Sequence, residues 1–62
     1  MFNKKAGLFC VKYAYRMTRL LIDTEKHEEM LKEFEETCLE NGVTQEEIEV
    51  AKIEVLDQLL SY

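Results

Sequence analysis

Apolar residues recur along most of the chain at spacings of three and four, and this periodicity predicts helices rather than strands. The C-terminal part shows it most clearly. One helical face there carries Ile48, Ala51, Val55 and Leu59. A second apolar stripe beside it consists of Ile53, Leu56 and Leu60. The two stripes together cover about half of the helix circumference, so we expect this helix to touch two neighbours.

The sharpest boundary in the sequence lies at residues 41–44. Asn41-Gly42 is a helix stop, because glycine adopts the left-handed backbone conformation without a steric penalty. Thr44 and Glu47 have the spacing of a capping box, in which the threonine bonds forward and the glutamate reaches back. These signals predict a final helix at about residues 45–61.

The two preceding segments differ in how much of their surface is apolar. In residues 24–40 a narrow edge of Leu31, Phe34 and Cys38 is apolar, and glutamates cover most of the remainder. In residues 5–22 the polar positions are few. The cations Lys5, Lys12, Arg16 and Arg19 fall within a narrow sector of the helical wheel, and nearly all other directions are apolar. Such a helix has to be surrounded by other elements.

Whether these two segments form separate helices decides the architecture. Asp23 and Thr24 are good N-cap residues, which favours a break and a small three-helix bundle with helices at about 5–22, 24–40 and 45–61. A heptad-like apolar pattern that continues from Ala6 to Cys38 favours one helix instead. The alternative is then a long-helix hairpin, 5–40 and 45–61, that pairs into a four-helix dimer.

We favour the all-α three-helix bundle as a single domain over residues 1–62. A chain of 62 residues buries a limited core, so a homodimer is compatible with either architecture.

Charge is distributed unevenly along the chain. The net charge is −5, yet the first 22 residues contain no acid and all 13 acidic residues follow them. Lys12, Arg16 and Arg19 interrupt the apolar first segment, so it fits neither a signal peptide nor a membrane span. We expect an acidic cytoplasmic protein with reduced thiols and no membrane association.

The chain offers few residues for chemistry. Zinc sites need about four ligands, commonly in tight cysteine or histidine pairs, and here only Cys10, Cys38 and His27 are present at wide spacing. Both cysteines lie on the apolar pattern, where free cysteine packs as a small hydrophobe. We expect no catalytic residues, no metal and no cofactor, and therefore no enzyme.

The remaining function class is recognition. We expect a small regulatory or adaptor protein that works through protein–protein interaction, such as an inhibitor of a larger enzyme of the kind that phages and plasmids carry. The expected apolar contacts are Phe2, Leu8, Phe9, Val11 and Tyr15. The alternative is a dimeric nucleic-acid-binding regulator, which would use the basic stripe of Lys5, Lys12, Arg16 and Arg19 on phosphates.

Overall fold

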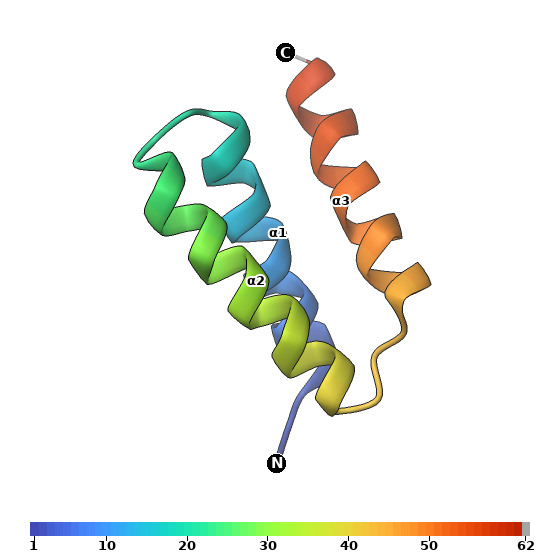
Figure 1. Ribbon diagram of the computed structural model, residues 1–62. Helices are drawn as coiled ribbons and strands as arrows, with labels where there is room; N and C mark the ends of the chain where they lie inside the picture. Colours follow the sequence, from blue (N-terminus) through green and yellow to red (C-terminus); the bar gives the residue numbers. More distant parts are fainter. Residues whose placement is uncertain (62) are drawn as a thin grey trace.

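Three helices make up the fold in the computed structural model, which describes residues 1–61. Helix α1 spans Lys4–Arg19, α2 spans Thr24–Glu40 and α3 spans Gln45–Leu60; the described chain contains no strand. Helices α1 and α2 form an antiparallel hairpin, and α3 then runs in the same direction as α1 (Figure 1). The three-helix prediction is confirmed. The alternative long helix over 5–40 is not formed, because the chain turns at residues 20–23.

Helix α1 is the central element of the packing. It contacts both α2 and α3 extensively, whereas α2 and α3 make few contacts with each other. The main core cluster consists of Val11, Cys38, Val43 and Ile48, with Phe2, Leu8, Leu31 and Phe34 packed against it. Ala14, Ala51 and Val55 are buried as well. The most apolar segment of the chain thus lies in the groove between the other two helices, as its composition requires.

A glycine within α1 permits the close approach of α1 to α2. A Cβ atom at Gly7 would lie 3.1 Å from the Cys38 sulfur and 3.0 Å from the Cε2 atom of the Phe2 ring. Both distances are tighter than ordinary van der Waals contact. Gly7 therefore leaves room for Phe2 to fold back over the first turn of α1 and cover Cys38.

The turn between α1 and α2, called here the first turn, begins three residues earlier than the apolar pattern predicts. The amides of Leu21 and Ile22 donate to the carbonyls of Thr18 and Met17, which is the Schellman arrangement. Leu21 consequently has a φ of 60°, and Asp23 has a φ of 43°. Asp23 occupies the N-cap position of α2, but its side chain makes no capping hydrogen bond. The predicted break at Asp23 and Thr24 is confirmed, but Asp23 has a left-handed backbone in place of the extended conformation that an N-cap normally adopts.

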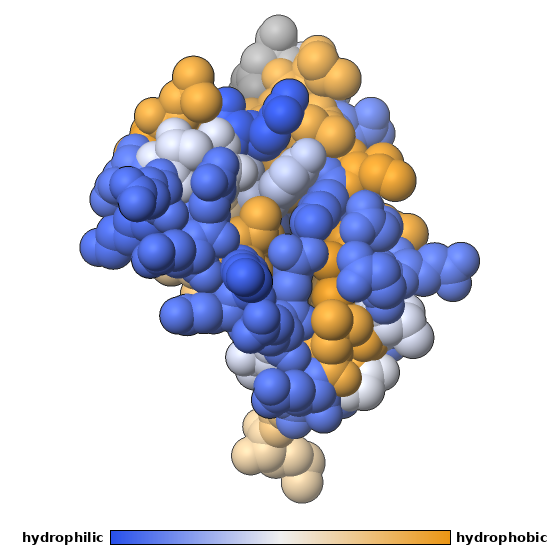
Figure 2. All heavy atoms as spheres, in the orientation of Figure 1, coloured by the Kyte–Doolittle hydropathy of each residue, from blue (hydrophilic) through white to orange (hydrophobic). Residues whose placement is uncertain are grey.

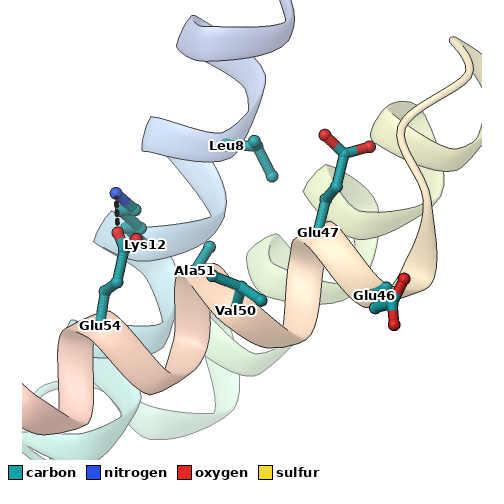
Figure 3. A pocket seen from close by; sticks show the side chains of 7 residues that line it. All are labelled: Leu8, Lys12, Glu46, Glu47, Val50, Ala51 and Glu54. Carbon is teal, nitrogen blue, oxygen red and sulfur yellow. Dashed lines mark ion pairs between the residues drawn. The ribbon is translucent and has the colours of Figure 1, made fainter.

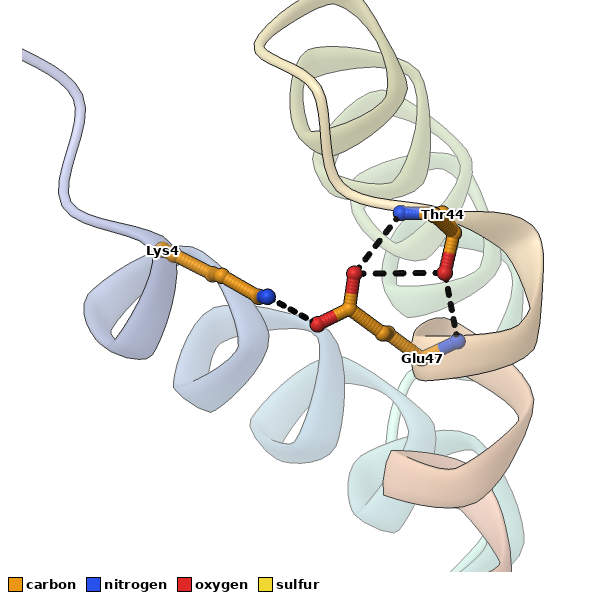
Figure 4. A network of polar contacts seen from close by, with 3 residues as sticks. All are labelled: Lys4, Thr44 and Glu47. Carbon is orange, nitrogen blue, oxygen red and sulfur yellow. Dashed lines mark hydrogen bonds and ion pairs between the residues drawn. The ribbon is translucent and has the colours of Figure 1, made fainter.

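The second turn is built as the sequence predicts. The amides of Gly42 and Val43 donate to the carbonyls of Leu39 and Cys38 in a second Schellman arrangement, with a φ of 89° at Gly42. Thr44 and Glu47 form the full capping box at the start of α3. Lys4 reaches the same carboxylate from the first turn of α1 (Figure 4). This hydrogen bond from Lys4 and those from Thr44 lower the pKa of Glu47.

Candidate functional site

The solvent-exposed side of α1 carries apolar and basic side chains in one row. This row, called here the outer face of α1, consists of Lys5, Phe9, Tyr13, Arg16 and Leu20. The spacing of four, four, three and four residues keeps all five on one side of the helix. Phe9 is 68% exposed, Leu20 48% and Tyr13 46%. Single exposed apolar side chains are ordinary, whereas several in one contiguous row are typical of a surface that binds another molecule.

Only one of the five apolar residues expected to contact a partner lies on this surface. Phe9 is exposed, but Val11 is fully buried in the core. Phe2 and Leu8 pack against the core cluster. Tyr15 is half-buried, with the Lys52 ammonium 5.7 Å from the centre of its ring. In this fold the four residues other than Phe9 stabilise the bundle, and Tyr13 and Leu20 are the exposed neighbours of Phe9 instead.

The exposure of Tyr13 and Leu20 could have been predicted from their helical positions relative to Phe9 and the basic stripe. Both residues lie at helical distance from Phe9 and beside the sector of the basic stripe. That sector has to face water because it holds the cations, so apolar residues next to it stay exposed too. The apolar residues on the opposite side of the helix, such as Val11 and Ala14, enter the core.

The structure divides the basic stripe between internal contacts and free cations. The Lys12 ammonium lies 2.6 Å from a carboxylate oxygen of Glu54, and the Arg16 guanidinium donates a hydrogen bond to the side-chain oxygen of Gln58. Lys5 and Arg19 have no ion-pair partner among residues 1–61. Part of the stripe therefore joins α1 to α3, and the rest extends into solvent.

Two hollows follow the line along which α1 and α3 meet. The first, of about 400 Å³, lies between Leu8 and Lys12 on α1 and Glu46, Glu47, Val50, Ala51 and Glu54 on α3 (Figure 3). The second, of about 380 Å³, is lined by Phe9, Lys12, Tyr13, Arg16, Met17 and Gln58. Apolar walls with a cation at the rim suit an apolar side chain that has a carboxylate close to it.

The outer faces of the other two helices differ from that of α1. The row called here the outer face of α3 consists of Glu46, Val50, Ile53, Asp57 and Leu60, and all five are exposed. Ile53 is 61% exposed and Leu60 is 83% exposed. The exposed side of α2 is dominated by charged residues, and Leu39 is its one large apolar residue. Figure 2 shows mostly hydrophilic residues over α2, hydrophobic and hydrophilic ones interspersed along α3, and hydrophobic ones at the upper end of the bundle.

Cys10, Cys38 and His27, the residues that could ligate a metal or act in catalysis, make contacts that stabilise the bundle. Cys38 is buried, and burial, followed by the nearby Cys10 and Glu35, raises the pKa of its thiol. Cys10 is half-buried, and both cysteines are free. The Nδ1 atom of His27 lies 2.6 Å from the carbonyl oxygen of Ile22, so the ring connects α2 to the turn between α1 and α2. Its ring also meets Tyr13 edge-on, with 6.3 Å between the centroids.

Within residues 1–61, no group of three or more histidine, cysteine, aspartate and glutamate side chains is placed to hold a metal ion. None of the helices in that range combines the length and the apolar character needed to cross a membrane. Comparison of the chain with protein-family models, with curated proteins and with solved structures finds no match.

Proposed function

We propose that this protein is a small regulatory or adaptor protein that binds a larger protein through the outer face of α1. The observation that carries the proposal is the exposed row of Phe9, Tyr13 and Leu20, which the cations Lys5 and Arg16 accompany on the same side of the helix. A 62-residue chain has little apolar area to spare for its own core. Leaving two aromatic residues and a leucine in water is costly unless another surface covers them.

The composition of the row indicates what the partner surface contains. Aromatic residues and arginine are enriched among the residues that dominate the energy of protein interfaces. Phe9 and Tyr13 also line the second hollow, which has Arg16 at its edge. A partner with an apolar side chain beside an aspartate or glutamate would fill this hollow and pair with Arg16 at its edge. We therefore propose an apolar and acidic surface on the partner.

Occupation of a surface is the mechanism that suits the shape of the molecule. The bundle measures 33 × 24 × 17 Å, and the outer face of α1 extends over several turns of helix. A rigid helix of this kind fits a groove in a partner by side chains spaced three, four and seven residues apart. An inhibitor that blocks a groove of a larger enzyme is the specific form of the proposal.

The test is the recovery of partners from the source cell with the wild-type protein and two matched variants. Phe9→Asp places a charge on the outer face of α1, whereas Leu39→Asp places one on the outer side of α2, where the wild-type leucine is also exposed. We expect a partner that Leu39→Asp retains and Phe9→Asp loses, with at least about tenfold weaker binding for the purified pair. Equal recovery by both variants would show that the partner binds elsewhere.

Nucleic-acid binding is the second candidate, since exposed Phe9 and Tyr13 beside cations resemble a stacking platform. The acids of α3 adjoin this surface, and Glu54 already neutralises Lys12. A titration of single-stranded and duplex nucleic acid across a salt series distinguishes the two candidates. Binding that weakens steeply with salt and is absent in the double variant Lys12→Glu with Arg16→Glu would favour the nucleic-acid candidate. We expect no binding even at low salt.

A further inference from the structure

The outer faces of α1 and α3 are complementary to each other in charge. The outer face of α1 contributes Lys5 and Arg16 around its apolar residues, and the outer face of α3 contributes Glu46 and Asp57 around Val50 and Ile53. We propose that a second copy of this chain covers both faces, with α1 of each copy on α3 of the other. This interaction requires no other protein, so it goes beyond the proposed function.

Internal contacts show that the two faces belong to one continuous surface. Helices α1 and α3 lie side by side and run in the same direction (Figure 1). Lys4 contacts Glu47 near the start of both helices, Lys12 contacts Glu54 near the middle, and Arg16 contacts Gln58 near the end. These three contacts fix which residues of α1 and α3 lie at the same height along the bundle. The two hollows follow the same line and leave the surface open between the helices.

A twofold axis parallel to the helices makes this surface complementary to itself. Rotation by 180° about such an axis places α1 of the second copy over α3 of the first, at the same height and in the same direction. Lys5 then faces Glu46 of the second copy, Phe9 faces Val50, and Arg16 faces Asp57. Each contact occurs twice, and four helices with their four apolar rows between them form the centre of the dimer.

Other pairings of the same surfaces are less favourable. If α1 lay on α1 of the second copy in the same direction, Lys5 and Arg16 would meet their own copies, and parallel pairing of α3 with α3 would bring acids together. The exposed side of α2 has Leu39 as its only large apolar residue and many charges. Among the parallel arrangements, the reciprocal one of α1 with α3 therefore matches both the apolar residues and the charges.

The dimer and the proposed partner complex use the same face of α1. A partner protein would therefore compete with the second copy, and dilution would release the binding surface. The two proposals can fail separately. A chain that is monomeric but binds a partner through Phe9 contradicts only the dimer, and a dimer that recovers no partner contradicts only the proposed function.

Two charge-reversed variants test the arrangement. The first, Lys5→Glu with Arg16→Glu, makes both outer faces acidic; the second, Glu46→Lys with Asp57→Lys, makes both basic. Sedimentation equilibrium of the wild type at increasing concentration should give a mass that rises from 7.4 kDa toward twice that value. Each variant alone should remain at the mass of one chain, and an equimolar mixture of the two should regain the dimer mass.

The control carries the same change of charge as the second variant, placed on α2. Glu28→Lys with Glu36→Lys alters two exposed residues on the side of the bundle that the dimer leaves free, so its dimer should persist. Circular dichroism checks that every variant remains helical. The proposal is overturned if the wild type stays at one chain mass up to millimolar concentration. It is also overturned if mixing the two folded variants restores nothing, or if the α2 control dissociates as they do.

Discussion

The two turns of this protein end their helices with the same hydrogen bonds but differ in the residues that make them. In the turn between α2 and α3, Gly42 adopts the left-handed conformation and Val43 is 3% exposed in the core. In the turn between α1 and α2, Leu21 adopts that conformation and Ile22 is 52% exposed. A left-handed conformation costs a leucine roughly 1–2 kcal/mol, and it costs glycine almost nothing.

The difference shows which turn stabilises the fold. Val43 follows its Schellman turn into the cluster with Val11, Cys38 and Ile48, so the second turn is fixed by the core. The first turn leaves Leu20, Leu21 and Ile22 in solvent and is held chiefly by backbone hydrogen bonds and the His27 ring. We therefore expect local opening to begin at the first turn, close to the end of the outer face of α1.

The largest expected contrast between the turns comes from the residue that follows each left-handed position. Val43→Ala removes buried methyl groups and leaves a cavity, so we expect a loss of about 2 kcal/mol in the free energy of unfolding. Ile22→Ala changes an exposed side chain and should alter it by less than about 0.5 kcal/mol. Urea denaturation followed by circular dichroism measures both. Equal losses would show that Ile22 is packed as well.

The left-handed positions themselves should respond in opposite directions. Gly42→Ala introduces a side chain at a φ of 89° and should lower the free energy of unfolding by about 1 kcal/mol. Leu21→Gly relieves the strained backbone and should raise the free energy of unfolding by up to about 1 kcal/mol. The greater conformational entropy of glycine in the unfolded chain offsets part of this gain. Thermal unfolding of the two variants checks the signs. A destabilised Leu21→Gly protein would mean that the leucine side chain packs onto the bundle.

The caps that follow the turns provide a third contrast. Thr44→Ala removes a side-chain acceptor from the Glu47 amide and should cost about 1 kcal/mol in unfolding free energy. Asp23→Ala removes no capping hydrogen bond and should have little effect on stability. The same denaturation series compares them. The interpretation of the first turn fails if Asp23→Ala is the more destabilised of the two.

The smallest effect is a pH dependence confined to the second turn. Because its hydrogen bonds lower the pKa of Glu47 in the folded state, this carboxylate stabilises the fold above its unfolded pKa. That contribution is lost as the pH falls through the folded value. Glu47→Gln should therefore flatten the decline in stability below about pH 4.5. The control Glu33→Gln alters an exposed carboxylate of α2 that forms no ion pair within residues 1–61, and it should leave the decline unchanged.

The same two turns show how much of the fold the sequence could predict. Gly42, Thr44 and Glu47 are residues whose chemistry specifies a helix end and a helix start, and the boundary at 41–44 is confirmed. The first turn has no glycine, and its apolar run from Leu20 to Ile22 continues the helical pattern. Its position depends on tertiary packing and on a strained Leu21, neither of which spacing reveals, so the helix end at residue 22 was placed too late.

The candidate site was predicted in part for a related reason. The pattern located an apolar helix with a narrow cationic sector, and that sector is indeed directed outward. It did not determine which apolar residues the other helices cover, because that depends on the angles at which α2 and α3 meet α1. Val11 therefore appeared equivalent to Phe9 in the sequence, although the first is buried and the second is 68% exposed.

The most direct test of the account is photo-crosslinking in the source cell with benzophenone-alanine at Phe9 and, separately, at Leu39. Both side chains are exposed, but only Phe9 lies on the outer face of α1. The account predicts discrete crosslinked species at Phe9, either to a larger protein or to a second copy, and none of comparable yield at Leu39. Crosslinks of equal yield at both positions, or none at Phe9, would contradict it.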